Sequence, residues 1–315
     1  MRKKISLVGS GNIGGTLAHL IALKELGDIT LIDIVKGVPQ GKALDLAQSS
    51  SVELFDVNIE GSNNYSSLKN SDVVIITAGI PRLPGMSRDD LLETNTKIIS
   101  TIGKAVKKYC PKAFLICITN PLDAMVSILQ LSSKVKHHMC VGMAGILDSS
   151  RMKYFLSKAL NVSIKSIETF VLGGHGDTMV PMIRYTTISG IPIQELIKNK
   201  TISKKRVNDI LKRTQNGGGE INQLLKKGSA FYAPASSAVQ MAESFLKNKK
   251  MILPCAAYLN GEYGVKGLYV GVPVIIGSKG VEKVIKLQLT AIEKKQFNNS
   301  VKAVRKLTNL ALKLS

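Results

Sequence analysis

The sequence predicts an α/β protein in which a doubly wound parallel sheet is followed by a mixed α/β domain. Two observations carry this prediction. Over residues 1–145, short β-branched runs alternate with segments of helical periodicity, and the strand-like runs are apolar throughout. Uninterrupted apolar strands separated by helices are typical of a parallel sheet that is covered on both faces.

The first part of the chain supplies the elements of this sheet. Strands are expected at Lys4–Val8, Ile29–Asp33, Val73–Thr77, Ala113–Ile118 and Met139–Gly142. Helices are expected at Ile13–Leu26, Val38–Ser50, Asp90–Lys108 and Ala124–Gln130. In the first of these helices, apolar residues recur on one face, among them Ile13, Leu17 and Leu20.

The second part of the chain is less regular. Helices are expected at Ser149–Leu160, Thr201–Arg213, Ser237–Leu246 and Glu282–Ser315, the last long and basic. Strands are expected at Ile167–Leu172, Met179–Tyr185, Tyr258–Leu259 and Tyr269–Ile276. The change of pattern near Gly142–Gly145 divides the chain into domains of residues 1–144 and 145–315. The cleft between them is the expected ligand site.

Composition excludes several classes of protein. The chain has 315 residues, 44% hydrophobic and 21% charged, which is typical of a globular protein and not of a disordered or coiled-coil one. No run reaches about 18 apolar residues, which argues against a membrane-spanning helix. The run Ile5–Val8 is too short for the core of a signal peptide, so a cytoplasmic protein is expected. The four cysteines lack C-x-x-C spacing and are expected to be buried thiols, and no metal site is expected.

The net charge of +21 is concentrated in the second part of the chain. Residues 1–145 carry 16 basic and 12 acidic side chains, whereas residues 146–315 carry 27 and 10, a net charge of +17. Such asymmetry can indicate binding to nucleic acid or to an acidic membrane surface. Because the lysines are scattered and no nucleic-acid-binding motif is present, we interpret the charge as a solvated face. Such a face can attract small dicarboxylate or phosphate ligands.

A glycine-rich hexapeptide, Gly9-Ser10-Gly11-Asn12-Ile13-Gly14, follows the first strand and opens the first helix. In this Rossmann arrangement the first glycine permits a tight turn, the second lets a pyrophosphate approach the backbone, and the third lets helix and strand pack closely. The free N–H groups of the helix start favour an anion. Asp33 lies 19 residues after Gly14, where a carboxylate can bind ribose hydroxyls and repel a 2′-phosphate, which favours NAD over NADP. Taken alone, Asp33 could equally be a solvated acid.

His175 is the candidate acid–base residue. It lies in Gly173-Gly174-His175-Gly176-Asp177 at the end of a predicted strand, where glycines allow a tight turn that a ligand can approach. Asp148 and Arg151 are three residues apart at a helix start and therefore face the same way. Asp148 could orient the imidazole and Arg151 could grip a carboxylate. A helix-capping aspartate and a surface arginine would show the same pattern.

Two arginines, Arg82 and Arg88, lie in the segment Gly79–Arg88, which follows the strand Val73–Thr77. Two prolines and two glycines in this segment are typical of a loop that closes over a site. The arginines would give such a loop two donors for anions. A solvated basic loop is the alternative.

Taken in order, these motifs resemble the lactate/malate dehydrogenase family, and most closely its malate dehydrogenases of the lactate-dehydrogenase-like bacterial type. The resemblance covers essentially the whole chain. Besides Asp33, it is carried by GSGNIGG, TAGIPRLPGMSR, ITNPLD, MAGILDSSR, GGHGD and FYAPASSAV. It implies a homodimer or homotetramer that reversibly oxidises (S)-malate to oxaloacetate with NAD, a reaction of the tricarboxylic acid cycle.

The resemblance also implies a role for each matching residue. His175 would accept the hydroxyl proton in malate oxidation, and Asp148 would orient it. The substrate-binding residues would be Arg82, Arg88, Asn120 and Arg151. Besides the glycine turn and Asp33, the cofactor-binding residues would be Asn95, Ile118, Thr119 and Asn120.

Arg82 matches the position that distinguishes the two substrates of the family. Lactate enzymes usually carry glutamine there, whereas malate enzymes carry an arginine that pairs with the second carboxylate of oxaloacetate. L-Lactate dehydrogenase is therefore the first alternative. An NAD-dependent glycosidase of related fold is a further one, but it would be expected to use a metal held by cysteine and histidine. No such pair accompanies the GGHGD segment.

Overall fold

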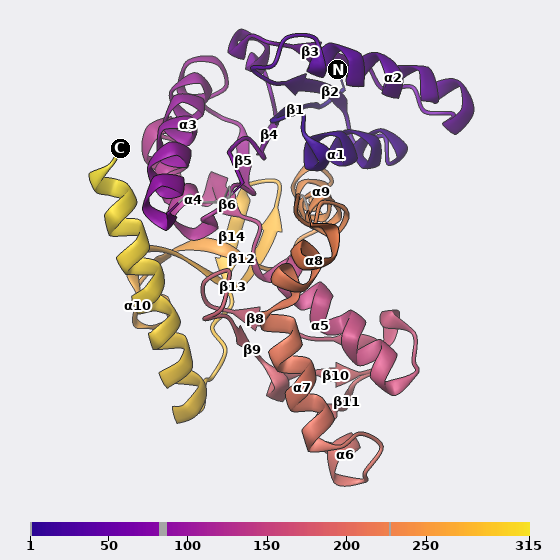
Figure 1. The fold of residues 1–315 in the computed structure, drawn as a ribbon, viewed down its shortest axis with the longest axis vertical. Helices are drawn as coiled ribbons and strands as arrows, with labels where there is room; N and C mark the ends of the chain where they lie inside the picture. The colour runs from indigo at the N-terminus through magenta and orange to yellow at the C-terminus, as the bar shows by residue number, and fades with distance from the viewer. Residues whose placement is uncertain (1, 82–86, 227) are drawn as a thin grey trace.

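A nine-stranded sheet forms the centre of the protein in the computed structural model, which describes residues 2–81, 87–226 and 228–315 (Figure 1). The strand order is β14-β13-β12-β6-β5-β4-β1-β2-β3. The six strands from β3 to β6 pair in parallel, whereas β12, β13 and β14 pair antiparallel. The strands are β1 (Lys4–Val8), β2 (Asp28–Ile32), β3 (Ile59–Ser62), β4 (Val73–Ile76), β5 (Phe114–Cys117), β6 (Cys140–Gly142), β12 (Met251–Asn260), β13 (Lys266–Gly277) and β14 (Gly280–Val284).

Helices cover both faces of the parallel part. They are α1 (Asn12–Leu23), α2 (Val38–Glu53), α3 (Arg88–Tyr109), α4 (Leu122–Ser133) and α9 (Tyr232–Leu246). Successive side chains of a strand face opposite ways, so Leu7 packs in one core with residues of α1 and α9, and Val8 packs in another with residues of α3 and α4. Both faces of the strands are therefore buried, which explains their uninterrupted apolar sequences and confirms the predicted fold class.

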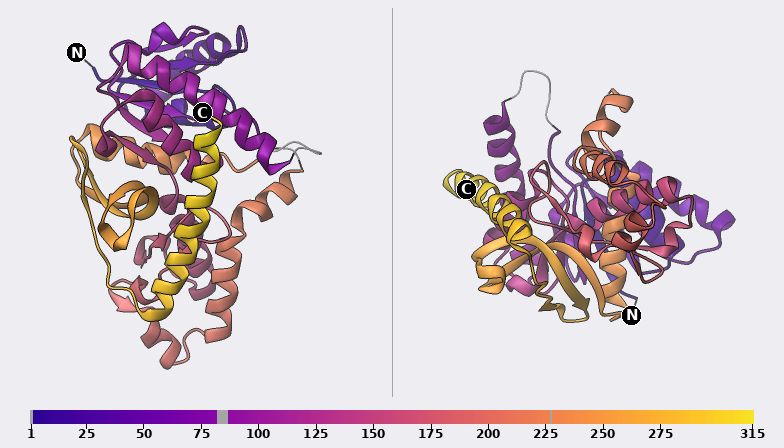
Figure 2. Two further views of the ribbon diagram at one scale, coloured as in Figure 1. Left: turned by 90° about the vertical axis from the view of Figure 1, so that its left-hand side faces the viewer. Right: turned by 90° about the horizontal axis from the view of Figure 1, so that it is seen from below.

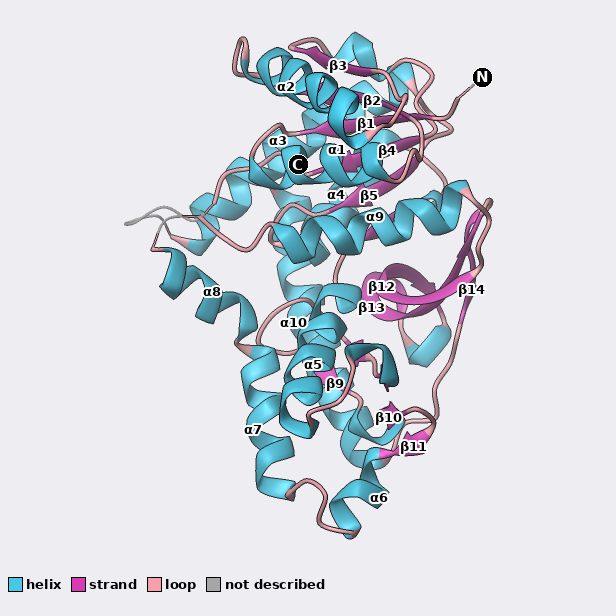
Figure 3. Cartoon of the chain, turned by 90° about the vertical axis from the view of Figure 1, so that its right-hand side faces the viewer, coloured by secondary structure: helices cyan, strands magenta, loops and turns pink. Residues whose placement is uncertain are grey.

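The second part of the chain extends the sheet and adds a smaller helical lobe. β12 pairs with β6, so the sheet continues from one part into the other. The lobe's helices are α5 (Gly145–Leu160), α6 (Ile193–Lys198), α7 (Lys204–Gln215) and α8 (Gly217–Leu225). Its short strands are β7 (Ile167–Glu168), β8 (Val171–Leu172), β9 (Val180–Pro181), β10 (Thr187–Ile188) and β11 (Ile191–Pro192). Figure 3 shows α6, β10 and β11 at the end of the molecule remote from β3.

Short 3-10 turns connect several of these elements. They are η1 (Tyr65–Leu68), η2 (His137–Met139), η3 (Ile164–Ser166), η4 (Ile183–Tyr185) and η5 (Glu262–Gly264). The cysteines are free and buried, as expected from their spacing. Across the described ranges, we find no helix that is both long and apolar enough to cross a membrane.

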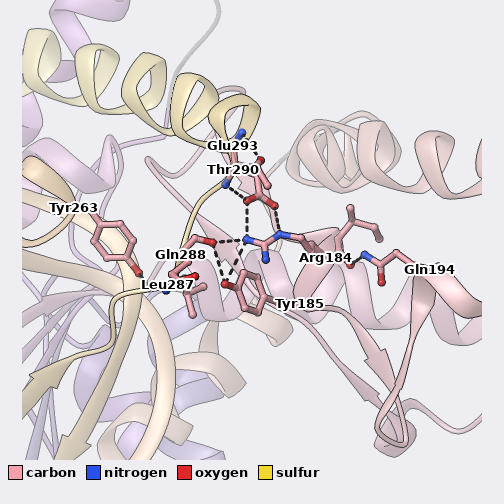
Figure 4. Close-up of polar contacts among 9 residues, drawn as sticks. Arg184, Tyr185, Gln194, Tyr263, Leu287, Gln288, Thr290 and Glu293 are labelled. Atoms are coloured by element: carbon pink, nitrogen blue, oxygen red, sulfur yellow. Dashed lines mark hydrogen bonds and ion pairs between the residues drawn. The ribbon is translucent and has the colours of Figure 1, made fainter.

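The last helix, α10 (Ala291–Lys313), lies along the side of both parts (Figure 2). The sequence predicts a helix from Glu282 onwards, and this is wrong for the first nine residues, because Gly280–Val284 forms the edge strand β14. The helix begins at a capping box, in which Thr290 Oγ1 accepts the backbone N–H of Glu293 and Glu293 Oε2 accepts the backbone N–H of Thr290. Glu293 also forms an ion pair with Arg184, which fixes this helix start to the lobe (Figure 4).

Two predicted strands are wrong in part. Ile167–Leu172 is interrupted, because Ile167 pairs with Ile188 in one small sheet and Leu172 pairs with Val180 in another. In Met179–Tyr185 only Val180–Pro181 is a strand, and a 3-10 turn follows. The sequence analysis also missed β3, which is short and partly polar, and α8, which starts with three glycines.

Phe114 tests the packing of the sheet against α9. Its side chain is fully buried on β5 and stacks on Phe245, with ring centroids 4.6 Å apart. We expect Phe114→Ala to lower the free energy of unfolding by about 3–5 kcal/mol, measured by urea denaturation, because it leaves a cavity between sheet and helix. Ile292→Ala is the control, because Ile292 is 73% exposed and its loss should change stability by less than about 0.5 kcal/mol. Equal effects of the two substitutions would contradict this packing.

Candidate active site

The glycine turn between β1 and α1 combines tight packing with an open face. Gly9 has φ +104°, and a Cβ there would lie 2.5 Å from Thr77 Oγ1. A Cβ on Gly14 would collide with the carbonyl oxygen of Gly9. In contrast, a Cβ on Gly11 would have no described atom within 4 Å. Gly9 and Gly14 are therefore required by the fold, whereas Gly11 leaves space for a ligand at the start of α1.

A cavity of about 760 Å³ opens in front of this turn. It is lined by residues at the carboxyl ends of five parallel strands, β1 to β5, where a ligand of an open α/β sheet binds. The predicted cofactor-binding residues on its wall are Gly9, Gly11, Asn12, Ile13, Asp33, Ile118, Thr119 and Asn120. Ser10, Gly14 and Asn95 are not among its lining residues. The cavity fits an extended ligand with a phosphate at the glycine turn.

The Asp33 carboxylate is held at the end of β2 by backbone donors. Its Oδ2 accepts the N–H of Ser10 at 2.7 Å, and its Oδ1 accepts the N–H of Val35 at 3.0 Å. Tyr65 lines the same cavity, and burial together with the charge of Asp33 raises the pKa of its hydroxyl. A negative charge fixed at this point suits hydroxyl groups and disfavours a phosphate.

Asn95 joins two walls of the cavity. Its Nδ2 donates to the carbonyl oxygens of Asn120, at 2.7 Å, and of Ile80, at 3.2 Å. Its Oδ1 accepts the N–H of Ile80 at 2.9 Å. Asn95 is 1% exposed, so it serves to hold the segments after β4 and β5 together.

His175 and Asp148 meet in the second part of the chain, as the sequence analysis expects. His175 follows β8, Asp148 lies in the first turn of α5, and His175 Nδ1 is 2.9 Å from Asp148 Oδ2. Burial by itself lowers the pKa of His175, but the charge and hydrogen bond of Asp148, together with the charge of Asp123, outweigh this effect and raise the pKa above its ordinary value of 6.5. The pair therefore stabilises a protonated imidazole.

Arg151 lies on the other side of the same carboxylate. Its Nη1 donates to Asp148 Oδ1 at 3.2 Å, so the spacing of three residues places both side chains together, as predicted. The Arg151 side chain is 12% exposed, and its buried Nε has no hydrogen-bond partner among the described residues. The guanidinium thus keeps unused donors for an anionic ligand.

Two glycines beside His175 make room for α10 and not for a ligand, which corrects one expectation. A Cβ on Gly173 would lie 2.5 Å from Ser300 Oγ, and one on Gly174 would lie 2.5 Å from Val304 Cγ2. Ser300 Oγ also accepts the N–H of Gly174 at 2.8 Å. Only Gly176, whose Cβ would have no described atom within 4 Å, faces open space.

Asp123 is a site residue that the sequence analysis missed. It lies in the first turn of α4, and its Oδ2 accepts the backbone N–H of His175 at 2.9 Å. Burial raises the pKa of Asp123 to about 6, although His175 partly opposes this shift. The available signal was a single charged residue at the start of the helix Leu122–Ser133, whose other residues are apolar or uncharged.

The segment Gly79–Arg88 carries the two arginines that are expected to bind anions. Arg82 lies outside the described residues. Arg88 is the first residue of α3, and only its backbone is described. The capping box of α3, formed by Ser87 and Asp90, fixes where the segment joins the helix.

Fold and site together define a two-part oxidoreductase with a dinucleotide cavity and an adjacent acid–base pair. Comparison with family models assigns residues 3–142 to the lactate/malate dehydrogenase NAD-binding domain and residues 146–314 to the lactate/malate dehydrogenase alpha/beta C-terminal domain. The chain therefore belongs to the lactate/malate dehydrogenase family, which confirms the resemblance seen in the sequence. Its cofactor is NAD, which fits the open face of Gly11 and the carboxylate of Asp33.

Solved structures of malate dehydrogenases and of lactate dehydrogenases are similar to the chain. The malate dehydrogenase of Cryptosporidium parvum is 50% identical, with 98% of each chain covered and a TM-score of 0.96. The lactate dehydrogenase of Eimeria maxima, solved with NADH and oxamate, is 51% identical, with 100% of this chain and 95% of that one covered and a TM-score of 0.97. The malate dehydrogenase of Plasmodium falciparum is 41% identical, with 99% of each chain covered and a TM-score of 0.96.

A substitution at Gly11 tests cofactor binding separately from the stability of the fold. Its backbone is extended, with φ −68° and ψ −156°, and a Cβ there meets no described atom, so we expect Gly11→Val to lower the melting temperature far less than Gly14→Ala does, by the loss of a good helix-capping residue alone. The same side chain would fill the space for the pyrophosphate and raise the Kd of NADH by about 100-fold, measured by fluorescence titration. Gly14→Ala is the contrasting variant, because it should destabilise the protein itself. Unchanged NADH affinity in Gly11→Val would contradict the proposed position of the pyrophosphate.

Proposed function

We propose that this protein is an NAD-dependent malate dehydrogenase that interconverts (S)-malate and oxaloacetate. The observation that carries the proposal is the buried Asp148 carboxylate, which contacts His175 on one side and Arg151 on the other. These contacts support a proton acceptor at His175 beside a binding group for a carboxylate at Arg151. A 2-hydroxy acid presents the matching pair of groups, a hydroxyl next to a carboxylate.

His175 is the proposed proton acceptor in malate oxidation. Asp148 holds the ring through Nδ1, which leaves Nε2 for the substrate hydroxyl. As the proton moves to Nε2, the imidazolium forms next to the Asp148 carboxylate, which stabilises it. In the reverse reaction the raised pKa of His175 favours the protonated ring, which is the proton donor. Bound NAD supplies the hydride chemistry.

The chain's remaining site residues bind and orient the reactants. Arg151 is proposed to grip the C1 carboxylate through a bidentate contact. Asn120, on the cavity wall, is proposed to donate to the reacting oxygen. The cofactor would be held by the glycine turn, Asp33 and the wall residues Ile118 and Thr119. Asn95 supports that wall through Asn120.

The proposed preference for malate over lactate depends on Arg82. Arg88 is proposed to polarise the carbonyl of the substrate. Arg82 would pair with the second carboxylate of oxaloacetate. Pyruvate carries a methyl group instead, and a guanidinium left buried without its partner costs about 3–5 kcal/mol. This cost corresponds to a preference of roughly a hundredfold to a thousandfold or more.

L-Lactate dehydrogenase is the second candidate, because the Eimeria maxima lactate dehydrogenase is as similar to the chain as the Cryptosporidium parvum malate dehydrogenase. NADH consumption with oxaloacetate and with pyruvate distinguishes the two. We expect kcat/KM to be at least about 100-fold higher with oxaloacetate. Arg82→Gln should reduce or reverse this preference without changing the Kd of NADH. A wild-type preference for pyruvate would contradict the proposed role of Arg82.

We also propose a homodimer or homotetramer in the cytoplasm, without nucleic acid or membrane as a partner. Support for self-association comes from large apolar side chains at the surface of α2 and just after it. Leu44 is 61% exposed, Val52 79% and Leu54 84%. Free buried cysteines are compatible with a reducing compartment.

A further inference from the structure

Helix α8 begins with three consecutive glycines, Gly217–Gly219, which its helical structure does not explain. Glycine is among the poorest helix formers, so three in one turn call for another reason. Asn216 both ends α7 and begins α8. The junction is fixed by a two-bond ion pair in which Arg213 donates to Glu220 at 2.8 and 2.6 Å. In Figure 1, α8 lies between α7 and α9.

Gly217 packs directly against Arg151. It is buried, and a Cβ there would lie 2.9 Å from Cδ and 3.4 Å from Nε of Arg151. Real Cβ atoms are essentially never found this close to another heavy atom, so one of the two groups would have to shift. A shift of the α8 backbone would disturb the whole first turn of the helix, whereas the Arg151 side chain can shift about its single bonds at the expense of its contact with Asp148. A methyl group at position 217 would therefore displace the guanidinium.

The Arg151 side chain has little room to move without losing its contacts. Arg151 is held at its far end by Asp148, with Nη1 and Oδ1 3.2 Å apart, and its side chain is only 12% exposed. If the Arg151 side chain moves, its donors no longer point where the C1 carboxylate would lie. Bidentate contacts depend on this direction, because both N–H groups must face the carboxylate together.

The other two glycines have different neighbours. A Cβ on Gly218 would lie 3.6 Å from Nη2 of Arg151, which is an ordinary contact distance. A Cβ on Gly219 would lie 2.7 Å from Oδ1 of Asn216, at the start of the same helix. Only Gly217 combines burial with a steric conflict at Arg151.

We propose that Gly217 is a positioning residue for the substrate carboxylate, because the absence of a side chain there lets the Arg151 guanidinium take its binding orientation. The inference rests on the proposed role of Arg151. It makes α8 the third support of that side chain, after its own helix α5 and Asp148. After α8, Gly228, Ser229 and Phe231 line the dinucleotide cavity, so one segment borders both the carboxylate site and the cofactor site.

The test compares Gly217→Ala with Gly218→Ala. Both substitutions add one methyl group to the same turn of α8, so their effects on helix formation match. With saturating NADH and whichever keto acid the wild type reduces, we expect Gly217→Ala to raise KM by about tenfold or more, while kcat changes by less than about threefold. Gly218→Ala should change KM by less than about twofold. Neither variant should bind NADH more weakly, or melt at a lower temperature, than the wild type.

A binding measurement keeps this test separate from the proposed reaction. Oxamate, an unreactive isostere of pyruvate, carries the same carboxylate, and its Kd for the enzyme–NADH complex can be measured by calorimetry. We expect the Kd to rise in Gly217→Ala and not in Gly218→Ala. If the wild type reduces neither oxaloacetate nor pyruvate, the proposed function fails, but the oxamate comparison still decides the role of Gly217.

A double-variant comparison tests whether Gly217 acts through Arg151. In an Arg151→Ala background both Cδ and the guanidinium are gone, so adding Gly217→Ala should have little further effect on the oxamate Kd. Equal effects of Gly217→Ala and Gly218→Ala, no effect of either, or full additivity with Arg151→Ala would overturn the proposal.

Discussion

The candidate site depends on one buried carboxylate, that of Asp148. Its side chain is 2% exposed, and its two oxygens bind different partners, His175 at 2.9 Å and Arg151 at 3.2 Å. A buried carboxylate is tolerated where its charge is paired, and loss of a partner typically costs about 3–5 kcal/mol. Its place in the first turn of α5 is also favoured by the helix dipole. The same group thus sets the distance between the proton acceptor and the guanidinium.

The sheet determines where this carboxylate lies. β6 ends at Gly142 and α5 begins at Gly145, so the helix start is fixed to a central strand. A Cβ on Gly145 would lie 2.6 Å from the carbonyl oxygen of Val171 and 2.9 Å from Cβ of Pro254. The start of α5 is therefore packed tightly between β8, which leads to His175, and β12. Asp123 and Ser300 hold the other side of the histidine loop through its backbone N–H groups.

Much of this arrangement could be predicted from the sequence because it is encoded locally. The apolar strands, the glycine turn and the spacing of Asp148 and Arg151 depend on neighbours in the chain, and the structure places each of them where the pattern indicates. The helix predicted from Glu282 started too early because basic and apolar residues of the edge strand continue the helical pattern.

What sequence analysis missed depends on contacts between distant segments. Asp123 binds a backbone N–H that is 52 residues away, and Ser300 binds one at a separation of 126. Gly173, Gly174 and Gly217 lack side chains because of groups from other helices, which no local pattern reveals. A glycine beside a candidate catalytic residue can thus make room for the fold instead of for a ligand.

The most direct test of the account is the pKa of His175, measured by NMR titration of protein labelled at its four histidines. His175→Asn would identify the resonance. We expect a pKa above the ordinary value of about 6.5 in the wild type, because Asp148 stabilises the imidazolium. In Asp148→Asn this charge is gone, and burial and the charge of Arg151 oppose the remaining charge of Asp123, so the pKa should fall. A wild-type pKa at or below 6.5, or one that Asp148→Asn leaves unchanged, would contradict the central role of this carboxylate.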